Sequence, residues 1–176
     1  MNLEGEHQFK GPRQEVWDMF RDPETLSACL PGKSQLTKID EQHFEGTINI
    51  RIGPVNGSFG GNLEITDEIP PEKCTLVVQG RGVTGFVKGI GHIQFVDQGD
   101  GTTLLKYTGE AQIGGTLASV GQRMIDSVAK TMIRAAFESL NKSLEVRLAA
   151  KESGGKGVRG SDSSKVNLEK PAEEKL

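Results

Sequence analysis

The sequence predicts an α+β fold: a curved antiparallel sheet of about seven strands around one long C-terminal helix, with two short helices after the first strand. Two patterns predict it. Up to residue 113, apolar and polar residues alternate in short segments separated by turn residues, as in a sheet with one buried face. From residue 116 to 148, apolar residues recur at three- and four-residue spacing, which is typical of an amphipathic helix.

The N-terminal part is predicted to form one strand and two short helices. Residues 2–10 alternate strictly, and Gly11-Pro12 ends this strand because proline fits a first helical turn better than a ladder. A helix with Val16 and Trp17 on its apolar face follows. Asp22-Pro23 begins a second helix, which Pro31-Gly32 ends.

Six further strands follow, and turn residues such as Gly53-Pro54 and Pro70-Pro71 separate them. Short connections between strands predict antiparallel pairing of neighbours. The expected strands cover residues 33–39, 44–52, 55–66, 74–81, 85–96 and 103–113.

The long helix is expected from Thr116, which could cap its first turn after Gly114-Gly115, to Leu148. At 1.5 Å per residue it would be about 50 Å long, enough to cross a small domain. Its solvated face is predicted to carry Arg123, Asp126, Ser127, Lys130, Arg134, Glu138, Asn141 and Glu145.

The composition changes at Lys151, after which Gly, Ser, Lys and Glu dominate and no aromatic residue occurs. We therefore expect a folded domain over residues 1–150 and a hydrophilic, disordered tail over residues 151–176. The alternative for this tail is a docking segment anchored by Val166 and Leu168.

Composition also narrows the function classes. The 176 residues carry a net charge of −3, which gives no reason to expect a nucleic-acid partner. Two cysteines and three scattered histidines form no metal-ligand pattern. The chain begins without a secretory signal and contains no apolar segment long enough for a membrane span. We expect a cytoplasmic protein without metal or cofactor.

Glycines are unusually placed. By alternation, the inner face of the sheet carries Gly5, Gly46, Gly57, Gly61, Gly80, Gly82, Gly109 and Ala111. Such glycines can mark bends and bulges in the sheet, or they can leave a cavity under the helix. Both interpretations stay open at this stage.

If a cavity exists, its lining would be mostly apolar, as in small-molecule pockets. His7 could hydrogen-bond a ligand carbonyl or be a core histidine with its own partner, and the Tyr107 hydroxyl could act in the same way. The candidate ligand-binding residues are His7, Phe9, Phe44, Ile48, Ile50, Phe59, Gly61, Tyr107, Leu117, Val120, Gly121, Met124, Val128 and Met132.

No motif for catalysis is found. Gly80-Arg-Gly82-Val-Thr-Gly85 matches the spacing of a dinucleotide-binding loop. That chemistry needs a helix N-terminus after the glycines, but the following residues alternate as a strand. No nucleophile elbow or paired carboxylates are evident, so no catalytic residue is assigned.

Four segments resemble the CoxG family of carbon monoxide dehydrogenase proteins, within the START (SRPBCC) superfamily of helix-grip proteins. They are Cys29-Leu-Pro-Gly32, residues 53–61, Gly80-Arg-Gly82 and residues 114–126. The resemblance implies a large apolar cavity between the sheet and the C-terminal helix. It also implies an accessory role beside molybdenum hydroxylases: maturation, membrane recruitment, or carriage of a lipid or quinone.

Three hypotheses follow. The first is a module that binds a hydrophobic small molecule, lipid or quinone-like. The second is a cavity enzyme of the cyclase or hydratase kind, with His7 and Tyr107 as its candidates. The third is a maturation or tethering partner for subunits of a molybdenum-containing dehydrogenase, in which peripheral contact with the inner face of the membrane stays open.

Overall fold

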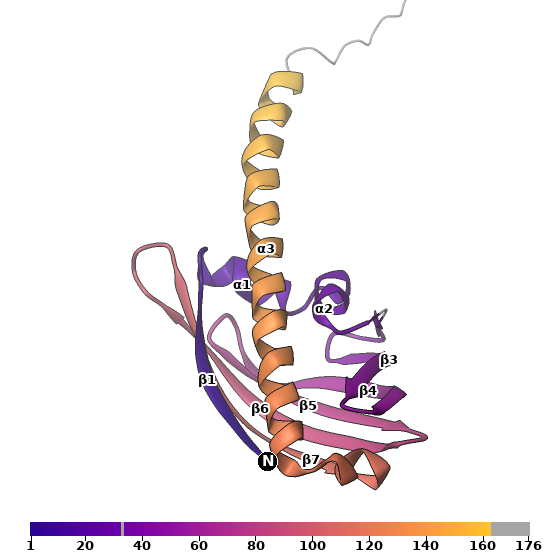
Figure 1. Ribbon diagram of the computed structural model, residues 1–176. Coiled ribbons are helices and arrows are strands. Elements are labelled where there is room, and N and C mark those ends of the chain that lie inside the picture. The colour runs from indigo at the N-terminus through magenta and orange to yellow at the C-terminus, as the bar shows by residue number, and fades with distance from the viewer. Residues whose placement is uncertain (33, 163–176) are drawn as a thin grey trace, which may run out of the picture. The chain divides into compact units, whose positions relative to one another are not determined.

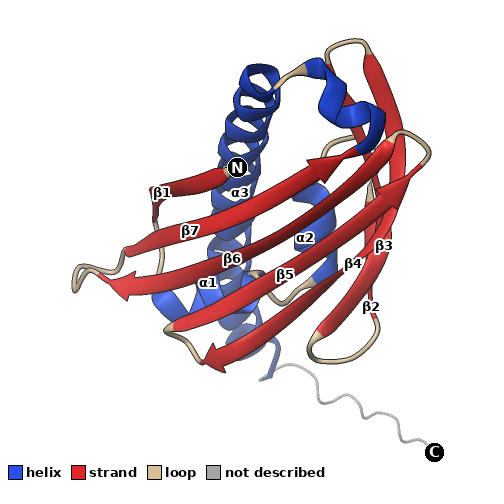
Figure 2. Cartoon of the chain, turned by 90° about the horizontal axis from the view of Figure 1, so that it is seen from below, coloured by secondary structure: helices blue, strands red, loops and turns tan. Residues whose placement is uncertain are grey.

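The computed structural model describes residues 1–32 and 34–162, with α3 covering the inner face of a seven-stranded sheet as far as Leu144 (Figures 1 and 2). The predicted fold class is confirmed. The elements are β1 (Asn2–Phe9), α1 (Arg13–Met19), α2 (Pro23–Cys29), β2 (Gln35–Lys38), β3 (His43–Ile52), β4 (Val55–Ile69), β5 (Lys73–Gly82), β6 (Gly85–Asp97), β7 (Thr103–Gly114), the 3₁₀-helix η1 (Gly115–Val120) and α3 (Gln122–Asp162).

The sheet is antiparallel throughout, in the order β1-β7-β6-β5-β4-β3-β2. Strands β2 to β7 follow their sequence order because each connects to the next by a short turn. The β5–β6 turn, where Gly82 pairs with Gly85, contains the glycine-rich motif. The motif is therefore a strand-to-strand hairpin, as the following alternation predicted.

β2 is short, and this shapes the sheet edge. It pairs with β3 only from Phe44 to Thr47. The remainder of β3, from Ile48 to Ile52, therefore forms an edge of the described sheet. The hairpin between β3 and β4 closes tightly, with Ile52 opposite Val55.

The core lies between the inner face of the sheet and the three α-helices. At one end, Trp17 of α1 packs edge-on against Phe95, with ring centroids 5.6 Å apart, and Phe20 does the same at 5.3 Å. On α3, the residues that face inward include Ile125, Leu140 and Leu144, which are buried. Their spacing is the helical repeat that the sequence predicted.

The start of the long helix differs from the expectation. Residues 115–120 form η1, and α3 begins at Gln122. Gly121 separates the two helices with φ 98° and ψ 148°, a conformation that is essentially restricted to glycine. The backbone therefore turns at Gly121, and Thr116 does not cap the long helix.

The end of the long helix also differs. α3 continues past Leu148 to Asp162, so the helix ends later than expected, while the expected division of the chain at residue 150 stays a prediction. Extending a formed helix is far easier than nucleating one, and Ala149, Ala150, Lys151 and Glu152 all have high helix propensity. Residues 163–176, with Val166 and Leu168, lie outside the described part of the chain.

Residues Met1–Leu144 form one compact unit, and the chain from Glu145 belongs to a second. Within the described residues, no helix is both long and apolar enough to span a bilayer.

Several inner-face glycines mark close backbone approach. A Cβ atom on Gly46 would lie 1.9 Å from the Gln35 carbonyl oxygen, and one on Gly61 would lie 2.0 Å from the Gln79 carbonyl oxygen. No side chain fits at such distances. At these two positions glycine serves strand packing and does not provide a cavity.

Candidate functional site

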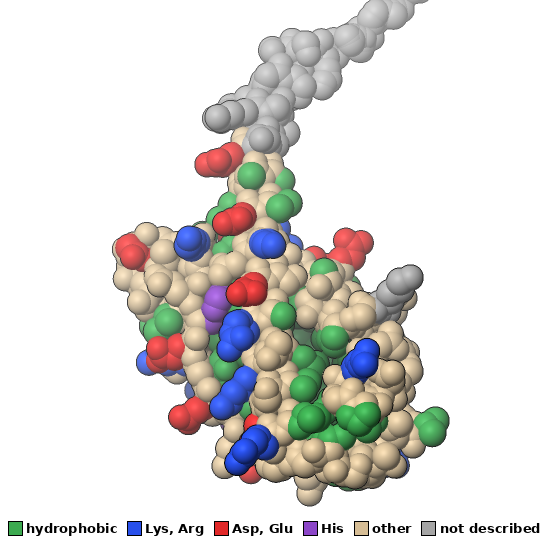
Figure 3. Space-filling view, viewed as in Figure 1, with side chains coloured by type: hydrophobic (Ala, Val, Ile, Leu, Met, Phe, Trp, Pro, Cys, Tyr) green, Lys and Arg blue, Asp and Glu red, His purple; other side chains and the backbone are tan. Residues whose placement is uncertain are grey.

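A groove of about 600 Å³ runs between α3 and the β3–β4 hairpin, within the unit Met1–Leu144. Figure 3 shows hydrophobic side chains gathered in this hollow beside the helix. Its volume is within the range of about 300 to 1,000 Å³ found for small-molecule pockets. The residues that line it are Pro31, Gly32, Asn49, Ile50, Arg51, Asn56, Gly57, Ser58, Val128 and Met132.

The apolar part of the groove continues into the core. Ile50 and Val128 pack against a buried cluster of Ile52, Phe59 and Leu117, whose side chains are at most 5% exposed. Val120 on η1 packs on the same cluster. η1 thus closes one end of the apolar region, and an apolar ligand in the groove would contact a preformed apolar surface.

Polar residues form the rim along the edge strand β3. The Arg51 Nε–H donates to the Gly53 carbonyl oxygen at 3.4 Å, and no carboxylate among the described residues lies within 4.0 Å of its guanidinium. The Asn49 backbone N–H donates to the Ser34 hydroxyl at 3.2 Å. The side chains of Asn49, Arg51 and Asn56 line the groove and can hydrogen-bond a polar group of a ligand whose apolar part lies on the interior.

The structure brings together only part of the predicted site. Ile50, Val128 and Met132 line the groove, and Phe59, Leu117 and Val120 lie in or against the cluster beneath it. Ile48 is half-buried opposite Phe59. Phe9 and Phe44 are fully buried core residues.

Three predicted positions do not fit a ligand-binding role in this geometry. Gly61 is blocked by the neighbouring strand, as described above. Gly121 is exposed and serves the turn into α3. Met124 is 41% exposed and lies over Gly53 at the β3–β4 turn, outside the lining of the groove.

His7 and Tyr107 belong to a different cluster, on β1 and β7. The Asn141 Nδ2–H donates to His7 Nε2 at 2.7 Å, so this ring nitrogen is an acceptor and the imidazole is neutral. Phe137 stacks on His7 at 4.9 Å and lies 5.5 Å from the Tyr107 ring. Burial lowers the pKa of His7, and the nearby Glu138 carboxylate raises it by a smaller amount.

His7 is thus a core histidine with a partner, which was one of the two open interpretations. Two residues of this cluster were missed. Asn141 was expected on the solvated face, and Phe137 was not assigned to either face. Phe137 lies three residues before the buried Leu140, and Asn141 lies three before the buried Leu144, a spacing that could have indicated that they face inward.

Most of the groove residues that were not predicted from the sequence are polar residues or glycines. Asn49, Arg51, Asn56 and Ser58 alternate with the inward residues of β3 and β4, and this alternation predicts that they face outward. They reach the groove because β3 is an edge strand at this point. Pro31 and Gly32 join them from the loop after α2, so two of the four family-like segments meet at the groove.

Both thiols are unreactive in this environment. Burial raises the pKa of Cys74 to about 12. Burial also raises the pKa of Cys29, whose thiol donates to the Thr25 carbonyl oxygen at 3.1 Å. Neither cysteine has thiolate character at neutral pH.

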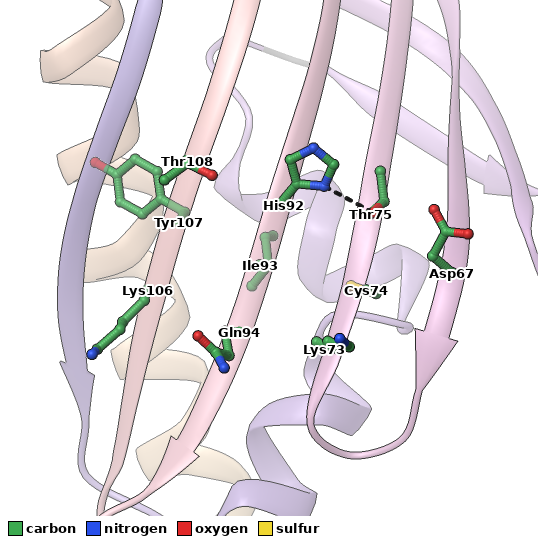
Figure 4. A pocket seen from close by; sticks show the side chains of 10 residues that line it. All are labelled: Asp67, Lys73, Cys74, Thr75, His92, Ile93, Gln94, Lys106, Tyr107 and Thr108. Carbon is green, nitrogen blue, oxygen red and sulfur yellow. Dashed lines mark hydrogen bonds between the residues drawn. The ribbon is translucent and has the colours of Figure 1, made fainter.

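A second pocket, of about 460 Å³, lies on the outer face of the sheet (Figure 4). His92 and Thr75 line it, with the Thr75 hydroxyl 3.1 Å from His92 Nδ1. Lys73 and Lys106 flank them, and Asp67 borders the pocket from the bulge in β4. Three charged side chains, Asp67, Lys73 and Lys106, line this pocket, whereas Arg51 is the one that lines the groove. The groove is therefore the better candidate for an apolar ligand.

The family model of CoxG, a subunit of carbon monoxide dehydrogenase, matches residues 5–145. The chain belongs to the CoxG family. The match covers every strand except the first residues of β1, and it ends one residue after the compact unit. Comparison with curated proteins returns no match.

Solved structures support the fold. A conserved protein from Geobacillus kaustophilus is 34% identical, with a TM-score of 0.76 over 82% of this chain and 95% of that one. The Zhui aromatase/cyclase from Streptomyces sp. R1128 is 10% identical, with a TM-score of 0.61 over 84% of this chain and 95% of that one. A START superfamily protein from Mycobacterium smegmatis is 12% identical, with a TM-score of 0.60 over 82% of this chain and 97% of that one. CoxG membership and the START-like fold together suggest a hydrophobic-ligand-binding domain.

Proposed function

We propose that this domain binds a hydrophobic small molecule, of the lipid or quinone class, in the groove between α3 and the β3–β4 hairpin. The observation that carries the proposal is the groove itself. Ile50, Val128 and Met132 provide an open apolar surface above a buried apolar cluster. Covering such a surface with an apolar ligand is favourable by about 25 cal/mol per Å² removed from water.

The cavity-enzyme alternative receives less support. In the described part of the chain, Arg51 is the one ionisable side chain that lines the groove. General acid–base catalysis needs a titratable group within hydrogen-bond reach of the reacting atoms. His7 and Tyr107, the candidates for that role, pack on Phe137 and contribute nothing to the groove lining.

The accessory role is part of the proposal. The family is named for a component of carbon monoxide dehydrogenase, so we propose that the domain holds its ligand for a molybdenum-containing dehydrogenase. Peripheral contact with the inner face of the membrane would give it access to such ligands. Organic-solvent extraction of the purified protein, followed by mass spectrometry, would identify a co-purified lipid or quinone.

A bulky substitution in the groove tests the site directly. Val128→Trp places an indole where the ligand would lie, and Lys130→Trp places the same group on the opposite, exposed face of α3. We expect the Kd for the apolar dye Nile red to rise by roughly tenfold or more in the first variant, a loss of about 1.4 kcal/mol. The second variant should bind like the wild type.

The unfolding midpoint in urea controls for stability in both variants. Equal dye binding by the two variants, with both folded, would place the binding site elsewhere on the protein. Recovery of nothing but buffer and solvent by extraction, together with no dye binding by the wild type, would contradict the ligand-binding function.

A further inference from the structure

Arg51 is the one ionisable residue of the described chain that lines the groove, and most of its hydrogen-bond donors have no protein partner. Its Nε–H donates to the Gly53 carbonyl oxygen at 3.4 Å, and no other hydrogen bond or ion pair of this side chain occurs among the described residues. The N–H groups of its two terminal nitrogens are therefore available. Arginine presents its donors in a planar fork that fits a carboxylate or a phosphate.

The backbone contact places the Arg51 side chain beside α3. A Cβ atom on Gly53, which accepts from Arg51, would lie 2.6 Å from Met124 Sδ. Met124 lies about one helical turn before Val128, which lines the apolar side of the groove. The guanidinium thus lies at the end of the groove that adjoins the first turn of α3, next to the apolar surface.

Arg51 belongs to a polar patch on the β3–β4 hairpin. It pairs with Asn56 across the two strands, and Asn49 pairs with Ser58 in the same way. All four residues line the groove, and cross-strand partners lie within about 5 Å of each other. Because guanidinium, amide and hydroxyl groups all donate hydrogen bonds, the patch fits a group that is rich in acceptor oxygens.

The hairpin supplies no negative charge to balance Arg51. Between Glu45 and Glu64 the sequence contains no Asp or Glu, although the whole chain has a net charge of −3. A neutral apolar ligand would leave the guanidinium without a counterion, whereas an anionic head group would provide one. Because Arg51 is exposed, such a pair would remain partly solvated and avoid the large desolvation cost of a buried ion pair.

We propose that the groove binds amphiphiles with an anionic head group, a carboxylate or a phosphate, which the Arg51 guanidinium contacts while Ile50, Val128 and Met132 cover the apolar chain. This inference rests on the proposed function and narrows its ligand class to acidic lipids. Arg51 is then a specificity-determining residue of the site, and the apolar lining supplies most of the affinity.

Three probes with the same linear alkyl chain test the proposal: decanoate, decyl phosphate and the neutral 1-decanol. Isothermal titration calorimetry measures their binding to the full chain at about pH 7.5, where the carboxylic acid is ionised. In Arg51→Gln we expect the Kd for both anions to rise by roughly three- to tenfold, because a charged hydrogen bond at a partly solvated rim is lost. The Kd for 1-decanol should change by less than about twofold.

Arg134→Gln is the matched control, because Arg134 is exposed on α3 and lies outside the groove lining. It removes the same charge from the protein, so its Kd for each probe should equal that of the wild type. Raising the salt concentration from about 0.05 to about 0.5 M should weaken decanoate binding in the wild type more than in Arg51→Gln. The urea midpoint of Arg51→Gln should match that of the wild type, because the replaced side chain is exposed.

The outcomes separate the two claims. If the wild type binds none of the three probes, the ligand-binding function itself is contradicted. If it binds them and Arg51→Gln changes the Kd of the anions no more than that of 1-decanol, or if Arg134→Gln weakens the anions equally, this inference is overturned while the function stands. A response confined to decanoate or to decyl phosphate would support the inference and identify the head group as a carboxylate or a phosphate.

Discussion

At the scale of single residues, His7 links β1 to α3 through a hydrogen bond that requires the neutral imidazole. Neutral His7 accepts at Nε2 from the Asn141 amide. Protonation would place a hydrogen on Nε2 and oppose two donors to each other. Phe9 and Phe137 pack on the same ring, at 4.8 and 4.9 Å, so water has limited access to solvate the cation.

The resulting pH dependence has a definite sign. The folded-state pKa of His7 lies below its ordinary value, so the unfolded chain binds the proton first as pH falls. Stability supplied by neutral His7 is present above about pH 6.5 and declines below it, until the folded-state pKa is reached. We expect the free energy of unfolding to fall from pH 7.5 to 5.5 more steeply in the wild type than in His7→Gln.

Urea unfolding at four or five pH values in this interval measures the difference. His43→Gln is the matched control, because the Asp40 carboxylate raises the pKa of His43. His43 therefore stabilises the fold at low pH and loses that contribution as pH rises, so its removal should change the slope in the opposite sense. Parallel curves for the wild type and His7→Gln would contradict the assignment of His7 as the neutral acceptor.

At the scale of elements, adjacent glycines in β4 have different roles. A Cβ atom on Gly61 would meet the Gln79 carbonyl oxygen at 2.0 Å, whereas a Cβ atom on Gly60 would meet nothing within 4 Å. The two residues alternate to opposite faces of one strand. Only Gly61 is required for the approach of β5 to β4, which is the close packing that lets the sheet curve.

Gly61→Ala should therefore lower the free energy of unfolding by roughly 1–3 kcal/mol, since the backbone of β5 must move to admit the methyl group. Gly60→Ala should be neutral or stabilising by about 0.5–1 kcal/mol, because alanine loses less conformational freedom than glycine on folding. Chemical denaturation of the two variants measures both. If Gly61→Ala is as stable as Gly60→Ala, the β5 backbone does not restrict the side chain at position 61, and the proposed role of Gly61 in strand packing is contradicted.

At the scale of the whole molecule, the buried side chains of the described chain all lie between Phe9 and Leu144. The compact unit ends at the same place. We propose that residues 1–150 suffice to fold, and that the hydrophilic remainder acts only outside the core.

Truncation after Ala150 tests the boundary. We expect the free energy of unfolding to stay within about 1 kcal/mol of that of the full chain, because Lys151 and Glu152, the removed residues whose side chains the structure describes, are exposed. Binding of Nile red should also be unchanged. A molten or aggregated truncation product would show that the segment after residue 150 supports the fold.

The same truncation bears on the accessory role. If the tail docks on a dehydrogenase partner, co-purification with that partner should weaken on truncation, although the fold and dye binding persist. If the full chain and the truncated chain co-purify equally with the partner, any contact with the partner is made by residues 1–150.

The sequence alone determined the fold class and the direction of most side chains. Alternation along a strand and the 3.6-residue repeat of a helix depend only on local geometry, so the strands, the short helices and the buried Leu117, Leu140 and Leu144 could be predicted. The family could be recognised from four short segments, because residues at turns and close contacts can be replaced by few others.

Only the tertiary structure decided where the site lies. Local patterns cannot tell that β2 is too short to cover β3, yet this exposes the rim of the groove at Asn49 and Arg51. They cannot tell whether an inner-face glycine leaves room for a side chain, as at Gly80, or admits a neighbouring backbone, as at Gly61. Both outcomes depend on atoms that are far apart in the chain and meet only in the folded structure.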